Sequence, residues 1–116
     1  MAYKKNKYSA RKTTIDGITF DSAKEAARYK KLKMLESMGA IKELKMQVPF
    51  ELQPAFRYNG KQIRPIKYIA DFTYYAPDKN GNRVYVVEDA KGYRNYEYVI
   101  KRKMFLFKFG FEISEV

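Results

Sequence analysis

The chain is 116 residues long, contains neither cysteine nor histidine, and carries a formal net charge of +11 at pH 7. These absences exclude a disulfide scaffold, thiolate or imidazole metal ligands, and Ser-His or Cys-His catalytic dyads. We therefore expect one domain with its own apolar core, and we expect any metal to be Mg²⁺ or Mn²⁺ held by oxygen. The positive charge favours a polyanionic partner, most simply nucleic acid.

No stretch of the chain reaches the roughly 20 apolar residues of a membrane-spanning helix, and the N-terminus lacks the apolar segment of a signal peptide. We therefore expect a cytoplasmic protein with no membrane partner, and an acidic membrane surface is the weaker alternative to nucleic acid. Residues 1–12 have no apolar period and form a basic flexible arm, with cations at Lys4, Lys5, Lys7, Arg11 and Lys12. The arm either contacts phosphates or only improves solubility. Residues 13–116 are expected to form the single domain.

The domain begins with a predicted hairpin and a predicted helix. Asp16-Gly17 between two runs of β-formers indicates a tight two-residue turn. Ser22 followed by Glu25 matches a capping box, and Gly39 ends the helical spacing that follows. Glu25 is either a simple cap or a functional acid, and the spacing does not decide between them.

The next segment predicts an edge strand and a long central hairpin. Pro49 and Pro54 cannot donate to a ladder, so residues 46–54 belong at a sheet edge or are interrupted. Asn59-Gly60 predicts another tight turn, and residues 63–75 predict a long strand with an irregularity at Pro65.

After a turn at residues 78–82, residues 83–91 predict an antiparallel strand, which its apolar run suggests is central and buried on both faces. A helix over about 96–109 and a last strand over 111–116 complete the chain. The order is therefore a helix, three antiparallel strands, a helix and a strand. A strand–helix–strand crossover favours a parallel last strand, and hence a mixed sheet.

Two acids in the predicted hairpin are the candidate functional residues. In the simplest register across the 78–82 turn, Asp71 lies opposite Asp89, with Lys91 on the same face. Directly opposed strand residues have Cβ atoms roughly 4.5–5.5 Å apart, close enough for two carboxylates to share a divalent ion. The backbone carbonyl of Ala90 is a further candidate ligand, and the Glu25 carboxylate would either complete the set of ligands or orient a water molecule. The alternative is an Asp-Lys pair at a solvated sheet edge.

These residues resemble the PD-(D/E)XK nuclease superfamily. Glu25 lies in an early helix, Ala70-Asp71 in one strand, where the superfamily often has Pro-Asp, and Asp89-Ala90-Lys91 in the next. The chain is more closely similar to a family of short uncharacterised phage and prophage proteins within it, and this likeness covers nearly everything from Thr13 onward. The local matches are Phe20-Asp21-Ser22, Lys24-Glu25-Ala26, Phe50-Glu51-Leu52-Gln53-Pro54, Ile69-Ala70-Asp71-Phe72 and Val87-Glu88-Asp89-Ala90-Lys91-Gly92.

The resemblance implies an α/β fold with a restriction-endonuclease-like αβββαβ core, a mixed central sheet and flanking helices. It implies a Mg²⁺-dependent (or Mn²⁺-dependent) DNA endonuclease of phage type, with branched DNA such as Holliday junctions as a candidate substrate and DNA recombination as the setting. Asp71 and Asp89 would hold the metal, Lys91 would be the catalytic lysine, and Glu25 an accessory acid. Glu88 points to the other face of the strand, and Gln53 matches the family without an assigned role.

Two other functions stay open on the sequence: a non-catalytic nucleic-acid-binding module on the same fold, and a structural protein whose charge is incidental. DNA is the expected partner, although RNA is not separated from it. A homodimer also stays open, with residues 46–58 as its surface, and the expected location is the cytoplasm of a host cell. The expected nucleic-acid contacts are Lys4, Lys5, Arg11, Lys12, Lys24, Arg28, Lys101 and Lys103.

Overall fold

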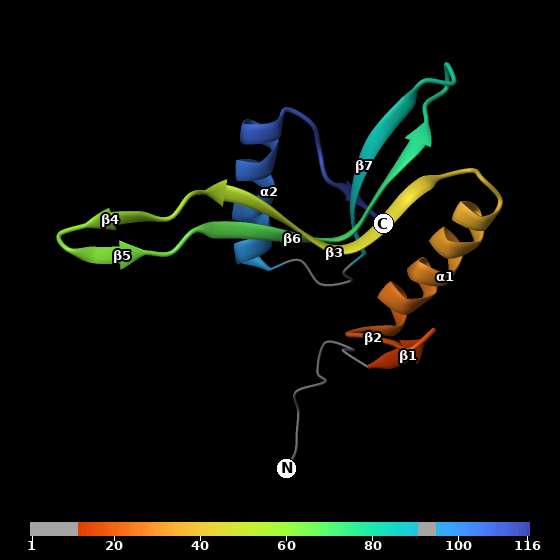
Figure 1. Ribbon diagram of the computed structural model, residues 1–116, viewed down its shortest axis with the longest axis horizontal. Coiled ribbons are helices and arrows are strands. Elements are labelled where there is room, and N and C mark those ends of the chain that lie inside the picture. The colour runs from red at the N-terminus through yellow and green to blue at the C-terminus, as the bar shows by residue number, and fades with distance from the viewer. Residues whose placement is uncertain (1–11, 91–94) are drawn as a thin grey trace, which may run out of the picture.

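The computed structural model describes residues 12–90 and 95–116, which form a mixed α/β arrangement (Figure 1). In chain order the elements are β1 (Thr13–Ile15), β2 (Ile18–Phe20), α1 (Ala23–Ser37), β3 (Lys42–Gln53), β4 (Phe56–Tyr58), β5 (Lys61–Ile63), β6 (Ile66–Pro77), β7 (Arg83–Asp89), α2 (Tyr96–Phe109) and β8 (Ser114–Glu115).

The central sheet has the strand order β3-β6-β7-β8, while β1 pairs with β2 and β4 with β5 in separate hairpins. β8 runs parallel to β7, and the other neighbours in the sheet are antiparallel. The predicted mixed sheet with two helices is therefore confirmed. Within the part of the chain that the structure describes, neither helix is long and apolar enough to cross a membrane.

Local sequence signals place the first three elements as predicted. Asp16 and Gly17 both have positive φ, as a type I′ turn requires, and they join β1 to β2. The Ser22 side chain accepts a hydrogen bond of 3.1 Å from the backbone N–H of Glu25, so Ser22 is the N-cap of α1. The helix ends just before Gly39, whose φ of +81° suits the left-handed conformation at that position.

β3 is a continuous edge strand rather than an interrupted one. Pro49 lies opposite Ile69 within the ladder to β6, and the edge position accommodates its missing N–H. Glu43 and Gln47 adopt positive φ, and a register shift falls between Lys42 and Lys45. These irregularities bend the strand where it passes α1.

The β6–β7 hairpin has the predicted register, because Phe72 lies opposite Glu88 and Thr73 opposite Val87. The expected irregularity at Pro65 is the break between β5 and β6. The prediction that β7 is buried on both faces is wrong for Val84 and Tyr85, whose side chains are exposed. The reason is that β8 is short and pairs only with the last two residues of β7.

The core consists of two clusters that meet on β6. The α1 cluster contains Phe20, Ala26, Tyr29, Leu32, Ile41, Phe72, Tyr74 and Ala90. The α2 cluster contains Leu52, Tyr68, Ala70, Val87, Tyr98, Phe105 and Ile113. Figure 1 shows α1 beside the start of β3 and α2 beside its end. Asp71 therefore sits between Ala70 of one cluster and Phe72 of the other, where the strand passes from α2 to α1.

Candidate active site

Asp71 and Asp89 lie at neighbouring positions on β6 and β7, and each is only 1% exposed. The last ladder pair is Phe72 with Glu88, so both aspartates lie one residue beyond it, in the register that the sequence predicts. Asp71 Oδ2 accepts a hydrogen bond of 2.8 Å from the backbone N–H of Ala90. This contact holds the Asp71 carboxylate against the segment that carries Asp89.

Tyr68 holds the Asp89 carboxylate from the α2 side. Its hydroxyl donates a hydrogen bond of 3.0 Å to Asp89 Oδ2. Burial, and then the negative charge of Asp89, raise the pKa of Tyr68 well above its ordinary value, so this hydroxyl stays a donor at neutral pH. Asp89 also lines a cavity of about 220 Å³ with Tyr68, Ile69, Asn95, Glu97, Tyr98 and Lys101.

Glu25 reaches the sheet from the first turn of α1, where its side chain is buried. Gln47 Nε2 donates a hydrogen bond of 3.1 Å to Glu25 Oε2. The flanking pairs Met46–Phe72 and Val48–Ala70 place Gln47 opposite Asp71 in the β3–β6 ladder. Gln47 therefore connects the predicted accessory acid to the strand position that faces Asp71.

Sequence reasoning missed Gln47 and pointed to Gln53 instead. Gln53 lies opposite Ile66 at the end of β3, whereas Gln47 lies opposite Asp71. The signal for Gln47 in the sequence is weak, since it is one polar residue between Met46 and Val48 in a predicted strand. Its role follows only from the packing of α1 against β3.

Replacing Gln47 by methionine should lower the free energy of unfolding by about 1 kcal/mol, because the buried Glu25 carboxylate loses a hydrogen-bond donor. Both side chains are unbranched and carry a Cβ, so the cost of the positive φ at this position changes little. Urea unfolding of the two proteins measures the difference. The same exchange at Gln62, on the exposed β5, is the control, and equal losses at both positions would contradict a specific role for Gln47.

Glu88 belongs to a separate contact on the α1 side of β7. Its side chain is fully buried and accepts hydrogen bonds from the Arg28 guanidinium, with 2.9 Å between Arg28 Nε and Glu88 Oε1, and from the Tyr74 hydroxyl. The hydrogen bond to Glu88 raises the pKa of Arg28, and burial followed by Glu88 raises the pKa of Tyr74. This ion pair connects α1 to β7, and Arg28 lies one helical turn after Glu25.

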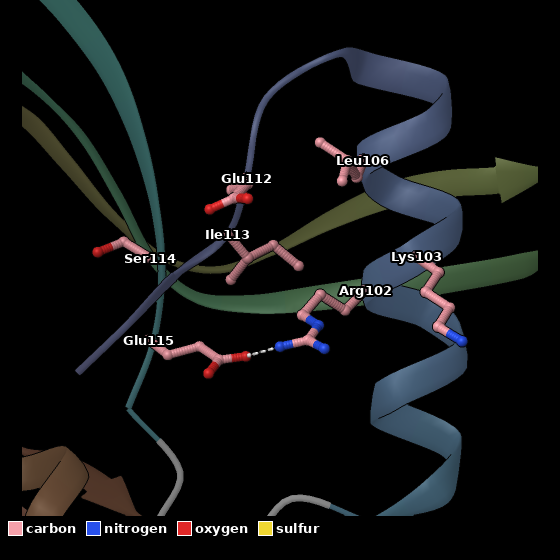
Figure 2. A pocket seen from close by; sticks show the side chains of 7 residues that line it. All are labelled: Arg102, Lys103, Leu106, Glu112, Ile113, Ser114 and Glu115. Carbon is pink, nitrogen blue, oxygen red and sulfur yellow. Dashed lines mark hydrogen bonds and ion pairs between the residues drawn. The ribbon is translucent and has the colours of Figure 1, made fainter.

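Glu115 is the acid next to Asp89 in the parallel β7–β8 ladder. Its carboxylate accepts hydrogen bonds of 2.7 Å from the Tyr98 hydroxyl and 3.1 Å from Arg102 Nη1. Figure 2 shows this Arg102–Glu115 contact beside a cavity of about 450 Å³ between α2 and β8, which is also lined by Lys103, Leu106, Glu112, Ile113 and Ser114. This contact connects β8 to α2 at Glu115, the residue that pairs with Asp89 in the ladder.

The remaining predicted site residues fall into three groups. Lys91, Lys4, Lys5 and Arg11 lie outside the described residues. Lys12, Lys24 and Lys103 are exposed, so their predicted contact with nucleic acid stays a prediction. Arg28 is bound to Glu88, and Lys101 pairs with Glu97 at 2.8 Å.

Within residues 12–90 and 95–116, no group of three or more acidic side chains converges closely enough to hold a metal ion. The donor chemistry nevertheless suits a hard cation, because Asp71, Asp89 and Glu25 offer only carboxylate oxygens. The arrangement therefore offers two buried carboxylates on adjacent strands and a third on α1, oriented by Ala90, Tyr68 and Gln47.

A protein-family comparison matches residues 5–114 to a family model described as a protein of unknown function. The chain belongs to the DUF1064 family. Comparisons of this DUF1064 chain with curated proteins and with solved structures found no match.

Proposed function

We propose that this DUF1064 protein is a Mg²⁺-dependent DNA endonuclease with a restriction-endonuclease-like core of the PD-(D/E)XK type. The element order α1, β3, β6, β7, α2 and β8 supports this finer fold, since it follows the αβββαβ pattern. The observation that carries the proposal is the hydrogen bond from the Ala90 N–H to Asp71, which holds two buried carboxylates at neighbouring positions, one in the middle of β6 and one at the end of β7.

Two neighbouring buried carboxylates are costly unless something compensates their charges. A divalent cation does so, and Asp71, Asp89, the Ala90 carbonyl and Glu25 are the groups that would hold it. When bound, such a cation supplies Lewis-acid chemistry and lowers the pKa of a water molecule. Lys91, which the strand alternation predicts on the same face as Asp89 and which lies outside the described residues, would neutralise charge on the scissile phosphate or hold the attacking water.

The protein's own groups prepare this site before any substrate binds. The Tyr68 hydroxyl fixes one oxygen of Asp89, and the Ala90 N–H fixes one oxygen of Asp71. Gln47 orients Glu25 from the strand opposite Asp71. Such preorganisation keeps the carboxylates in place, so that little reorganisation is needed during the reaction.

Cleavage of a DNA panel tests the proposed function. Linear duplex, single-stranded, flap and four-way-junction DNA are incubated with the wild-type protein in Mg²⁺, in Mn²⁺ and in EDTA. We expect cleavage of at least one substrate with metal, none in EDTA, and loss of cleavage in Asp89→Asn and Lys91→Ala. Asp21→Asn, which alters an exposed acid just before α1, should cleave like the wild type. A wild-type protein that is inert on every substrate would contradict the proposal.

The second candidate is a non-catalytic nucleic-acid-binding module. It is favoured by the absence of a converging group of three acids within the described residues. A thermal melt with increasing Mg²⁺ separates the two functions. The nuclease requires a rise in melting temperature that Asp71→Asn abolishes, whereas the binding module predicts no rise in either protein.

A further inference from the structure

The β4–β5 hairpin stands apart from the central sheet. β4 and β5 pair with each other rather than with the strands that precede and follow them. Asn59 and Gly60 both have positive φ and form the tight turn at its tip. Figure 1 shows the hairpin extending past the end of the β3–β6 pair and away from both helices. It is therefore a two-stranded ribbon with solvent on both faces.

The ribbon and the segments that flank it are basic. No aspartate or glutamate occurs from Gln53 to Ala70, whereas Arg57, Lys61, Arg64 and Lys67 all fall in this range. All four side chains are exposed, and none forms an ion pair with a residue that the structure describes. The Arg57 side chain spans the turn, where its Nη2 donates a hydrogen bond of 2.9 Å to the Gly60 carbonyl oxygen.

The two faces of the ribbon differ. The pairs Phe56–Ile63 and Tyr58–Lys61 share one face, and Arg57–Gln62 lies on the other. Phe56 is 46% exposed and Tyr58 is 66% exposed, so the aromatic side chains do not serve the protein's own core. Exposed aromatics interleaved with unpaired cations suit a partner that is both polyanionic and rich in flat apolar surface.

We propose that the β4–β5 ribbon is an arm that contacts duplex DNA, with Arg57, Lys61 and Arg64 against the phosphates along a groove. A two-stranded ribbon fits the major groove, which is about 12 Å wide. A second copy of the chain is the less favourable occupant, because two acid-free ribbons would bring like charges together. The inference rests on DNA as the partner in the proposed function, but it does not depend on cleavage.

Fluorescence anisotropy of a labelled duplex, titrated with protein in EDTA, tests the arm without cleavage. The arm variant carries Arg57→Glu, Lys61→Glu and Arg64→Glu together. The control variant carries Lys42→Glu, Lys79→Glu and Arg83→Glu. Lys42 is exposed at the start of β3, opposite Tyr75, and Lys79 and Arg83 are exposed at the turn between β6 and β7. Both variants change the net charge equally, so a difference between them reports local contact rather than the overall field.

We expect the arm variant to bind duplex DNA about tenfold or more weakly than the control, with a shallower dependence of affinity on salt. Equal affinities of the two variants for duplex DNA would overturn the inference. In a parallel titration of a labelled single strand, a loss of affinity confined to that single strand would also overturn it. A difference in oligomeric state between the DNA-free wild type and the DNA-free arm variant would also overturn it, because the ribbon would then bind a second copy of the chain. If the wild-type protein cuts DNA but the arm variant binds duplex DNA as tightly as the control variant, the inference about the ribbon is refuted and the proposed function stands.

A trimmed protein keeps the test decisive if the charge-reversed variant does not fold. Gln53 lies opposite Ile66, so residues 54–65 can be replaced by Asn-Gly in a two-residue turn between β3 and β6. Circular dichroism checks that the trimmed protein is folded. Its affinity for duplex DNA should fall as in the arm variant, and wild-type affinity would overturn the inference.

Discussion

Replacing Asp71 by asparagine should reduce DNA cleavage by at least about 100-fold while leaving the metal-free protein nearly as stable as the wild type. An asparagine oxygen can still accept the hydrogen bond from the Ala90 N–H, which spans 2.8 Å in the wild type. The substitution therefore preserves the packing of β6 and removes the charge. Cations such as Mg²⁺ need that charge, since their protein ligands are chiefly carboxylates.

Two measurements together separate the catalytic role from a structural one. Initial cleavage rates in Mg²⁺ report the chemistry, and melting temperatures with and without Mg²⁺ report metal binding. Asp71→Asn should lose both the rate and the metal-dependent rise in melting temperature. Asp21→Asn, at an exposed position, should retain both. A large fall in stability of metal-free Asp71→Asn would show instead that the carboxylate is needed for folding.

The elements set by local chemistry were predictable from the sequence. Asp16-Gly17 and Asn59-Gly60 form the expected turns because their residues tolerate positive φ. Ser22 begins α1 and Gly110 ends α2, since each supplies the conformation or acceptor that a helix end requires. The register of the β6–β7 hairpin followed from its turn, and it places Asp71 and Asp89 at adjacent positions.

The contacts that depend on how α1 packs against the sheet were not predictable. The hydrogen bond from Gln47 to Glu25 starts from a residue with positive φ, and no glycine in the sequence signals that conformation. The pairing of Arg28 with Glu88 joins residues far apart in the chain, and the sequence indicated Arg28 as a nucleic-acid contact instead. Periodicity identifies which side chains share a face, but the partner of that face is decided by tertiary packing.

Replacing Glu88 by alanine should lower the free energy of unfolding by about 2–3 kcal/mol, because the buried Glu88 carboxylate is lost while the Arg28 side chain, which is 25% exposed, keeps some contact with water. Arg28 would lose its carboxylate partner and the Tyr74 hydroxyl would lose its acceptor. Glu88→Gln should cost less, since an amide oxygen still accepts from one of these donors. Urea unfolding of the wild type, Glu88→Ala and Glu88→Gln measures these losses. The control is Lys33→Ala, which breaks the exposed pair with Glu36 and should change the free energy of unfolding by less than about 1 kcal/mol.

A double-mutant cycle shows whether the pair itself is responsible. Arg28→Met with Glu88→Met removes both charges together, so its cost should be well below the sum of the two single changes. Additive costs would contradict the coupling that the geometry implies. The cleavage assay adds a second distinction, because Glu88 bonds to Arg28 and Tyr74 and not to the Asp71 and Asp89 site. A folded Glu88→Gln protein should therefore keep its activity, whereas Asp71→Asn should lose it.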